Sequence, residues 1–252
     1  MKTAFITGAT SGIGMEFAKV FASKGYRLIL TGRRTERLEE LKKKLKTECL
    51  IITADLSDES RCRALIDEVA DESIDVFINN AGFGASGSFL ETDLEKEVSM
   101  LKVNDLAMHI LFKGILKKMH RRGRGCIVNV ASSAGLFSGG PYMAAYYASK
   151  AYAASLTKSV AHELKEKNSR VYVCCLCPGP VDTEFNENAD VAFSLKGISA
   201  KRCVRECLAG MSKRQTVIIP TLWMKLAVWG WKFLPDSFSL KVVAHQQKKK
   251  LP

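Results

Sequence analysis

The stretch "TAFITGATSGIGMEFAKVFASKG" (residues 3–25) decides the fold of this chain. Its first five residues form an apolar run that is typical of a short strand, and residues 13–25 place apolar side chains at helical spacing before a terminal glycine. Glycines at positions 8, 12 and 14 lie at the junction. They allow a tight turn and close packing of helix on strand. The stretch therefore predicts a strand, a glycine-rich turn and a helix.

The same alternation of strand and helix continues along the chain. Ser57 is the predicted N-cap of the third helix. The strands are continuously apolar, which indicates a parallel sheet covered by helices on both faces. We expect an α/β fold, a doubly wound seven-stranded parallel sheet of Rossmann type, with its ligand crevice at the carboxyl ends of the strands. The predicted strands cover residues 3–7, 26–32, 49–54, 75–82, 125–132, 170–179 and 216–220, and the predicted helices cover 13–25, 35–46, 58–70, 94–119 and 142–167.

Composition favours one globular domain. The chain has 252 residues, 47% of them hydrophobic and 25% charged, without a repeat or a Pro/Ser-rich linker. Its eight cysteines and four histidines lack metal-ligand spacing, so we expect reduced thiols, no metal and a cytoplasmic protein. The N-terminus enters a strand pattern at once, which leaves no room for a secretory signal.

The net charge of +12 is concentrated near the C-terminus. Residues 201–252 carry 11 Lys/Arg against two acidic residues. The first 200 residues are nearly balanced, which argues against a nucleic-acid surface spread over the main body.

Three motifs occur in order on the predicted elements. The turn after the first strand reads TGxxxGxG, and the following helix N-terminus offers N–H groups to a diphosphate. "NNAG" (79–82) ends the fourth strand, and YxxxK (146–150) lies in the long helix. Together they resemble the short-chain dehydrogenase/reductase family, over residues 2–183. The resemblance implies hydride transfer between a nicotinamide dinucleotide and a carbonyl or secondary alcohol.

The end of the second strand bears on cofactor choice. Enzymes that bind unphosphorylated NAD usually place Asp or Glu there, whereas this chain has Gly32 followed by Arg33 and Arg34. Arginine holds a 2′-phosphate through charge-assisted hydrogen bonds, so we expect NADP, with Arg33 the better of the two. The alternative is that both arginines merely begin a charged helix.

The resemblance also implies the remaining cofactor contacts. Asp55 and Leu56 match the adenine subsite, and Asn80 is as readily a turn-stabilising residue as a contact. The implied cofactor-binding set is Gly8, Thr10, Ser11, Gly12, Ile13, Gly14, Arg33, Arg34, Asp55, Leu56, Asn79, Ala81, Gly82, Tyr146, Lys150, Pro178, Gly179, Val181 and Thr183.

By the same resemblance, Tyr146 is the general acid/base. Lys150, one helical turn later, supports it and reaches the ribose hydroxyls. A free phenol titrates near pKa ~10, and we expect the ammonium and the cofactor's positive ring to lower that value. Asn104 matches a mid-helix residue that anchors a water beside Lys150, and Tyr147 is predicted to pack.

Two serines compete as the hydrogen-bond donor to the carbonyl oxygen. Counting from the strand selects Ser132, and counting back from the tyrosine selects Ser133. The counts differ because "LFSGGP" (136–141) is one residue longer than usual. A loop tolerates an insertion more easily than a buried strand, so we favour Ser132.

The C-terminal segment bears on substrate and partners. We divide the single domain into a cofactor and catalytic core (1–183), a substrate lid (184–215), and a last strand with a basic, aromatic tail (216–252). "TLWMKLAVWGWKFLP" (221–235) holds all three tryptophans and predicts either a wall of an apolar pocket, opposite residues 185–197, or a peripheral membrane contact. We favour the wall. Both readings imply a bulky apolar or acyl substrate.

The family resemblance further implies a homodimer or homotetramer, paired through the helices at 94–119 and 142–167. The alternative to an enzyme is a non-catalytic NADP-binding scaffold.

Overall fold

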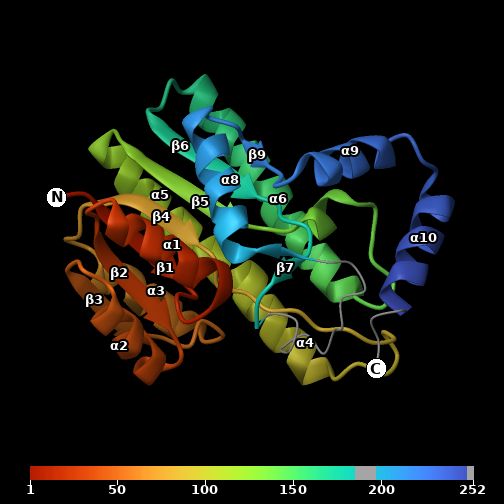
Figure 1. Cartoon of the computed structure of the whole chain (residues 1–252), viewed down its shortest axis with the longest axis horizontal. Coiled ribbons are helices and arrows are strands. Elements are labelled where there is room, and N and C mark those ends of the chain that lie inside the picture. Colours follow the sequence, from red (N-terminus) through yellow and green to blue (C-terminus); the bar gives the residue numbers. More distant parts are fainter. Residues whose placement is uncertain (185–196, 249–252) are drawn as a thin grey trace.

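The strands form one parallel sheet in the computed structural model, which describes residues 1–184 and 197–248 (Figure 1). The strand order is β3-β2-β1-β4-β5-β6-β9, and every neighbouring pair is parallel. The order reverses between β1 and β4, where the crevice of a doubly wound sheet is expected. The predicted seven-stranded sheet is confirmed. Its strands are β1 (Thr3–Thr7), β2 (Arg27–Gly32), β3 (Cys49–Thr53), β4 (Ile74–Asn79), β5 (Gly125–Val130), β6 (Val171–Leu176) and β9 (Val217–Ile218), and β7 (Val181–Asp182) pairs separately with β8 (Ile198–Ser199).

Helices cover both faces of the sheet. One apolar core joins the sheet to α3, α5 and α6, and a second joins it to α1, α2 and α8. The continuously apolar strands are therefore buried on both sides, as their sequences predict. The helices are α1 (Gly12–Ser23), α2 (Thr35–Lys44), α3 (Glu59–Glu68), α4 (Leu94–Leu101), η1 (Lys102–Ala107), α5 (Met108–Arg122), η2 (Ser133–Leu136), α6 (Ala144–Glu166), α8 (Ala200–Ser212), α9 (Leu222–Trp231) and α10 (Asp236–Lys248).

Two local predictions are wrong. The N-cap of α3 is Asp58, whose carboxylate accepts from the N–H groups of Ser60 and Arg61, while Ser57 donates to Asp55. An ionised side chain that satisfies two helix N–H groups is the better cap. The single helix predicted at 94–119 is α4 and α5 joined by η1, a π-helical stretch, and it runs on to Arg122.

The C-terminal helices α9 and α10 stand at the end of the molecule far from β3 (Figure 1). They close a third, smaller apolar cluster around Met143, Tyr146 and Tyr147, to which Trp231 and Val243 contribute. Within residues 1–184 and 197–248, no helix combines the length and the apolar character needed to cross a membrane.

Candidate active site

A cavity of about 890 Å³ opens along the carboxyl ends of the strands. It runs from the glycine-rich turn after β1 to α9 and α10. It collects most of the predicted site residues; Gly14, Asn79 and Asn104 do not line it. Asn79 is buried and donates to the carbonyl of Met108 and the amide oxygen of Asn129, which ties β4 to its neighbours.

The glycine-rich turn has the backbone that its sequence predicts. Gly8 and Gly12 have φ of 63° and 53°, in the left-handed region that favours glycine. A Cβ at Gly14 would lie 2.3 Å from the carbonyl oxygen of Gly8, so only glycine allows the chain to pass so closely. Helix α1 begins at Gly12, and the side chain of its N-cap, Ser11, makes no capping hydrogen bond. The first turn of α1 therefore presents main-chain N–H groups at the cavity, as a diphosphate requires.

Asn80 holds the ends of β1 and β4 together. Its side-chain amide donates to the carbonyls of Thr7 and Gly8, and its main-chain N–H donates to the Thr7 hydroxyl. These hydrogen bonds hold the glycine-rich turn after β1 in place. Asn80 thus has the turn-stabilising role, and it also lines the cavity.

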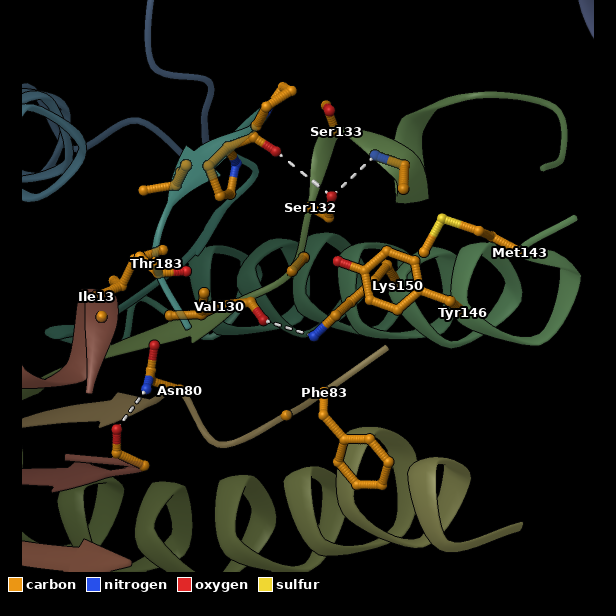
Figure 2. A pocket seen from close by; sticks show the side chains of 18 of the residues that line it. Ile13, Asn80, Phe83, Val130, Ser132, Ser133, Met143, Tyr146, Lys150 and Thr183 are labelled. Atoms are coloured by element: carbon orange, nitrogen blue, oxygen red, sulfur yellow. Dashed lines mark hydrogen bonds between the residues drawn. The ribbon is translucent and has the colours of Figure 1, made fainter. Parts of the chain in front are cut away.

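Helix α6 presents Tyr146 and Lys150 to the cavity, and both are buried. The ammonium of Lys150 donates to the carbonyl of Val130 at 3.3 Å and lies 5.8 Å from the ring centroid of Tyr146. Figure 2 shows the two side chains on one face of the helix, with the phenol oxygen directed toward Ser132. One helical turn between them produces this arrangement.

The end of β5 resolves the choice between the two serines. The Ser132 hydroxyl lies beside the Tyr146 phenol and limits the rise of its pKa, accepts from the Ala134 N–H at 3.1 Å and donates to the Pro178 carbonyl at 3.4 Å. Ser133 donates its main-chain N–H to Pro178, and its side chain points away from Tyr146 (Figure 2). Ser132, and not Ser133, therefore lies beside the phenol.

Burial sets the protonation of this group. It raises the pKa of Tyr146, and the neighbouring Ser132 side chain opposes the rise only in part. Burial also lowers the pKa of Lys150 to about 8, against the opposing effect of Asp105. In the protein alone the pKa of the phenol is raised, because a phenolate at this site loses its hydration, and the lowering expected with the cofactor's positive ring stays a prediction.

Asn104 lies in the π-helical stretch η1, and its side chain is fully engaged. Its amide oxygen accepts from the Phe83 N–H, and its amide nitrogen donates to the Phe83 carbonyl and to Ser149. A Cβ at Gly82 would lie 2.8 Å from Asn104 Oδ1 and 3.2 Å from Lys150 Nζ. Gly82 and Phe83 form the floor of the cavity. The wider π turn places Asn104 directly behind this floor, close to Lys150.

The chain is similar to known proteins of one family. The family model for short chain dehydrogenases matches residues 2–192. The chain belongs to the short-chain dehydrogenase family. It is 29% identical to mouse "Dehydrogenase/reductase SDR family member 7B" over 264 residues, covering 97% of this chain and 80% of that protein. It is an oxidoreductase with a nicotinamide cofactor.

Solved structures of the family share the whole architecture. A short-chain dehydrogenase from Sphingobium yanoikuyae in complex with NADPH is 28% identical with a TM-score of 0.82, over 94% of this chain and 98% of that one. A short-chain dehydrogenase/reductase from Burkholderia phymatum in complex with NAD is 26% identical, also with a TM-score of 0.82, over 90% and 92%. Relatives of this similarity hold either cofactor.

At the end of the cavity beside α2, two arginines converge on one carboxylate. Arg34 donates to the Thr10 hydroxyl at 3.0 Å and to Glu184 at 3.2 Å, and Arg37 donates to Glu184 at 2.7 Å. Although desolvation opposes it, hydrogen bonds from Arg34 and Arg37 hold the pKa of Glu184 below its usual value. Arg33 lines the cavity but is exposed.

Sequence reasoning missed Arg37 and Glu184. Arg34 is the N-cap of α2 and Arg37 lies in its first turn, so the spacing of three residues between them was an available signal. Glu184 is 147 residues from Arg37, and no local pattern joins them.

The C-terminal helices form the opposite wall. Trp231 packs edge-on against Phe137 with ring centroids 4.9 Å apart, and Gln247 donates to the Tyr147 hydroxyl at 2.7 Å. Tyr147 therefore packs as predicted, and it also lines the cavity. Residues 185–196, part of the expected second wall, lie outside the described residues, and residues 200–212 form α8 beside α1. The residues that α9 and α10 place on the cavity are Trp223, Met224, Ala227, Trp231, Val242, Val243, Gln246 and Gln247.

Proposed function

We propose that this protein is an NADP(H)-dependent carbonyl reductase/alcohol dehydrogenase that acts on a bulky, apolar carbonyl substrate. The observation that carries the proposal is the buried contact of Ser132 with Tyr146, above Lys150, at one side of a cavity whose far wall is tryptophan, methionine and valine. A binding module has no need of a phenol, a hydroxyl and an ammonium brought together in this way.

The residues present fit a nicotinamide dinucleotide. The turn at Gly8 and Gly12 leaves room for a diphosphate against the N-terminus of α1, and Gly82 leaves open the space beside Asn104 and Lys150. In our proposal the turn holds the diphosphate, Asp55 and Leu56 flank the adenine, and Val181 and Thr183 lie by the nicotinamide. When bound, the cofactor supplies or accepts the hydride.

In our proposal the chain's own side chains donate the proton and stabilise the charge that develops on the carbonyl oxygen. In our proposal the Ser132 hydroxyl turns its one proton from the Pro178 carbonyl, 3.4 Å away, to the substrate's carbonyl oxygen as negative charge grows on it. Tyr146 then gives that oxygen its proton. The phenol carries its proton at neutral pH, at its ordinary pKa of ~10 and still more so when burial raises that pKa, so the proton to be transferred is in place in the free protein. Lys150 places positive charge beside the phenol, and Asn104 fixes the segment at Phe83 that forms the floor.

Turnover is tested by NADPH oxidation with a panel of ketones, aldehydes and 3-oxoacyl thioesters. The proposal is supported if activity rises as the apolar groups on the carbonyl carbon become larger. Tight binding of NADPH without turnover of any member of the panel would favour a non-catalytic scaffold instead.

The preference for NADP rests on the two arginines that hold Glu184. An anion already occupies this position, and a 2′-phosphate is an anion of higher charge that accepts the same hydrogen bonds. We expect Arg34→Ala to weaken NADPH relative to NADH by roughly ten- to hundredfold, since a hydrogen bond to a charged group contributes about 1.5–3 kcal/mol. Titration of both cofactors, followed by nicotinamide fluorescence, measures the ratio.

Companion variants separate the arginines. Arg33→Ala tests the residue favoured by the sequence, and Arg37→Ala tests the one that the sequence missed. Glu184→Gln removes the competing charge and should strengthen NADPH selectively. Arg63→Ala is the matched control, because Arg63 is exposed on α3 and pairs with Glu59. An unchanged NADPH/NADH ratio in all three arginine variants would reject the preference.

We also propose that the protein self-associates through α4, η1 and α6. This face exposes Leu101, Leu106 and Tyr152. We expect a dimer or tetramer in sedimentation velocity at micromolar concentration, and a shift toward monomer for Leu106→Glu, because a buried carboxylate without a partner is costly. A wild-type protein that sediments only as a monomer contradicts this proposal.

A further inference from the structure

Helix α9 has two apolar faces. Its inner face is packed, with Met224 and Val228 buried and Ala227 and Trp231 against the cavity. Its outer face exposes large side chains spaced four, three and four residues apart, which places them along one side of a helix. They are Leu222, Leu226 and Trp229 on the helix and Phe233 in the turn that follows it, with exposed fractions of 71%, 58%, 63% and 70%.

This outer face is an organised surface. The rings of Trp229 and Phe233 contact each other at 5.1 Å between centroids. Phe238 and Leu240 on α10 are also exposed, with exposed fractions of 53% and 36%. Single exposed apolar side chains are ordinary, but a contiguous row of this kind marks a surface that another body covers.

Lysines are interleaved with the apolar side chains. Lys225 lies three residues after Leu222 on α9, near Glu206 of α8, and Lys232, three residues after Trp229, is the C-cap of the helix; both lysines are exposed. Lys241 and Lys248 follow on α10, and the only carboxylate among residues 221–248 is Asp236. We call the set Leu222, Lys225, Leu226, Trp229, Lys232 and Phe233 the outer stripe of α9.

The lysines decide what covers the outer stripe. In a two-fold dimer through this face, the stripe would meet its own copy and bring like charges together. The core of an interface with another protein is depleted of lysine. An anionic bilayer suits both components, because tryptophan and leucine enter the headgroup region while the ammonium groups face lipid phosphates. With 10 residues, α9 can lie on a bilayer but cannot cross it.

We propose that the protein binds the surface of an anionic membrane with α9 lying flat and its outer stripe in the headgroup region. The inner face of the same helix is a wall of the cavity, so the cavity would lie about one helix diameter, ~10 Å, from lipid. An apolar substrate could then enter from the membrane. This last consequence rests on the proposed function, whereas membrane binding itself does not.

The test is flotation of the full-length protein with vesicles of phosphatidylglycerol and phosphatidylcholine. We expect binding to anionic vesicles at low salt, weaker binding at 0.5 M salt, and little binding to pure phosphatidylcholine. The triple variant Leu226→Gln/Trp229→Gln/Phe233→Gln should bind at least ~100-fold more weakly. Lys225→Glu/Lys232→Glu should bind at least ~tenfold more weakly.

Neither variant changes a residue that lines the cavity, so NADPH affinity and turnover of a water-soluble ketone should match wild type and confirm that each variant is folded. Leu90→Gln, an exposed leucine before α4, is the matched control and should bind vesicles normally. Wild-type protein that stays unbound at low salt, or variants that bind equally well, would overturn the proposal. So would a triple variant that changes only the oligomeric state, since that result assigns the stripe to a second copy.

Discussion

Replacing Tyr146 by phenylalanine is expected to lower kcat by about 10³-fold or more while leaving the Kd for NADPH within about twofold of wild type. General acid catalysis by a positioned group contributes about 10²–10⁴-fold, and this variant removes the only hydroxyl that both contacts Ser132 and lies beside Lys150 in the described structure. The ring keeps its packing against Met143 and Ala134, so the fold and the cofactor site should be unaffected.

Tyr147→Phe is the matched control for this experiment. It removes a neighbouring buried hydroxyl that accepts from Gln247 and belongs to the packing of α10. We expect its kcat to stay within a few-fold of wild type, with any change appearing in KM for the carbonyl. Steady-state kinetics with NADPH and a ketone measure both variants. If Tyr146→Phe kept more than a few per cent of the wild-type rate, Tyr146 would not be the proton donor.

The strands of the sheet could be predicted from sequence because burial on both faces leaves an apolar run within each strand itself. A strand with a central apolar run, such as Ala4–Ile6 in β1 and Val76–Ile78 in β4, is recognised without knowing its neighbours. The glycine-rich turn is equally local, since positive φ at Gly8 and Gly12 restricts the residue type directly. The last strand was also found, although β9 pairs through only Val217 and Ile218.

What sequence could not supply depends on tertiary contacts. The π-helical stretch at Asn104 is coupled to bonds with Phe83 and Ser149, which are 21 and 45 residues away. The raised pKa of Tyr146 follows from burial, which a motif does not reveal. The same holds for the meeting of Glu184 with Arg34, 150 residues apart.

The two candidate serines show how a loop of changed length affects counting along the sequence. Two counts from fixed points gave Ser132 and Ser133, because a loop of unusual length lies between β5 and α6. In the structure β5 leads directly to Ser132, whose hydroxyl contacts Tyr146, and Ser133 is turned away at the start of η2. A strand within the sheet fixes the direction of the residue that follows it, whereas the loop before α6 absorbs the extra residue.

Ser132→Ala is therefore expected to lower kcat by about 10²–10³-fold, the usual effect of removing one donor to a developing oxyanion. Ser133→Ala should leave kcat within a few-fold of wild type, because alanine keeps the main-chain N–H that donates to Pro178. Ser132 also caps η2 through the Ala134 N–H, so its loss should cost about 1 kcal/mol of stability. Thermal unfolding measures that cost separately from catalysis.

Ser132→Thr distinguishes the catalytic role from the structural one. Threonine keeps a hydroxyl that can donate to the carbonyl oxygen and accept from the Ala134 N–H, so it should recover much of the activity lost in alanine. If Ser132 had only a structural role, the alanine variant would lose activity because part of it is unfolded. Its rate would then recover at assay temperatures well below its melting temperature. Equal, mild effects of Ser132→Ala and Ser133→Ala would remove the oxyanion donor from the mechanism. Tyr146 alone would then donate to the carbonyl oxygen, and the Ser132 hydroxyl would serve only to cap η2.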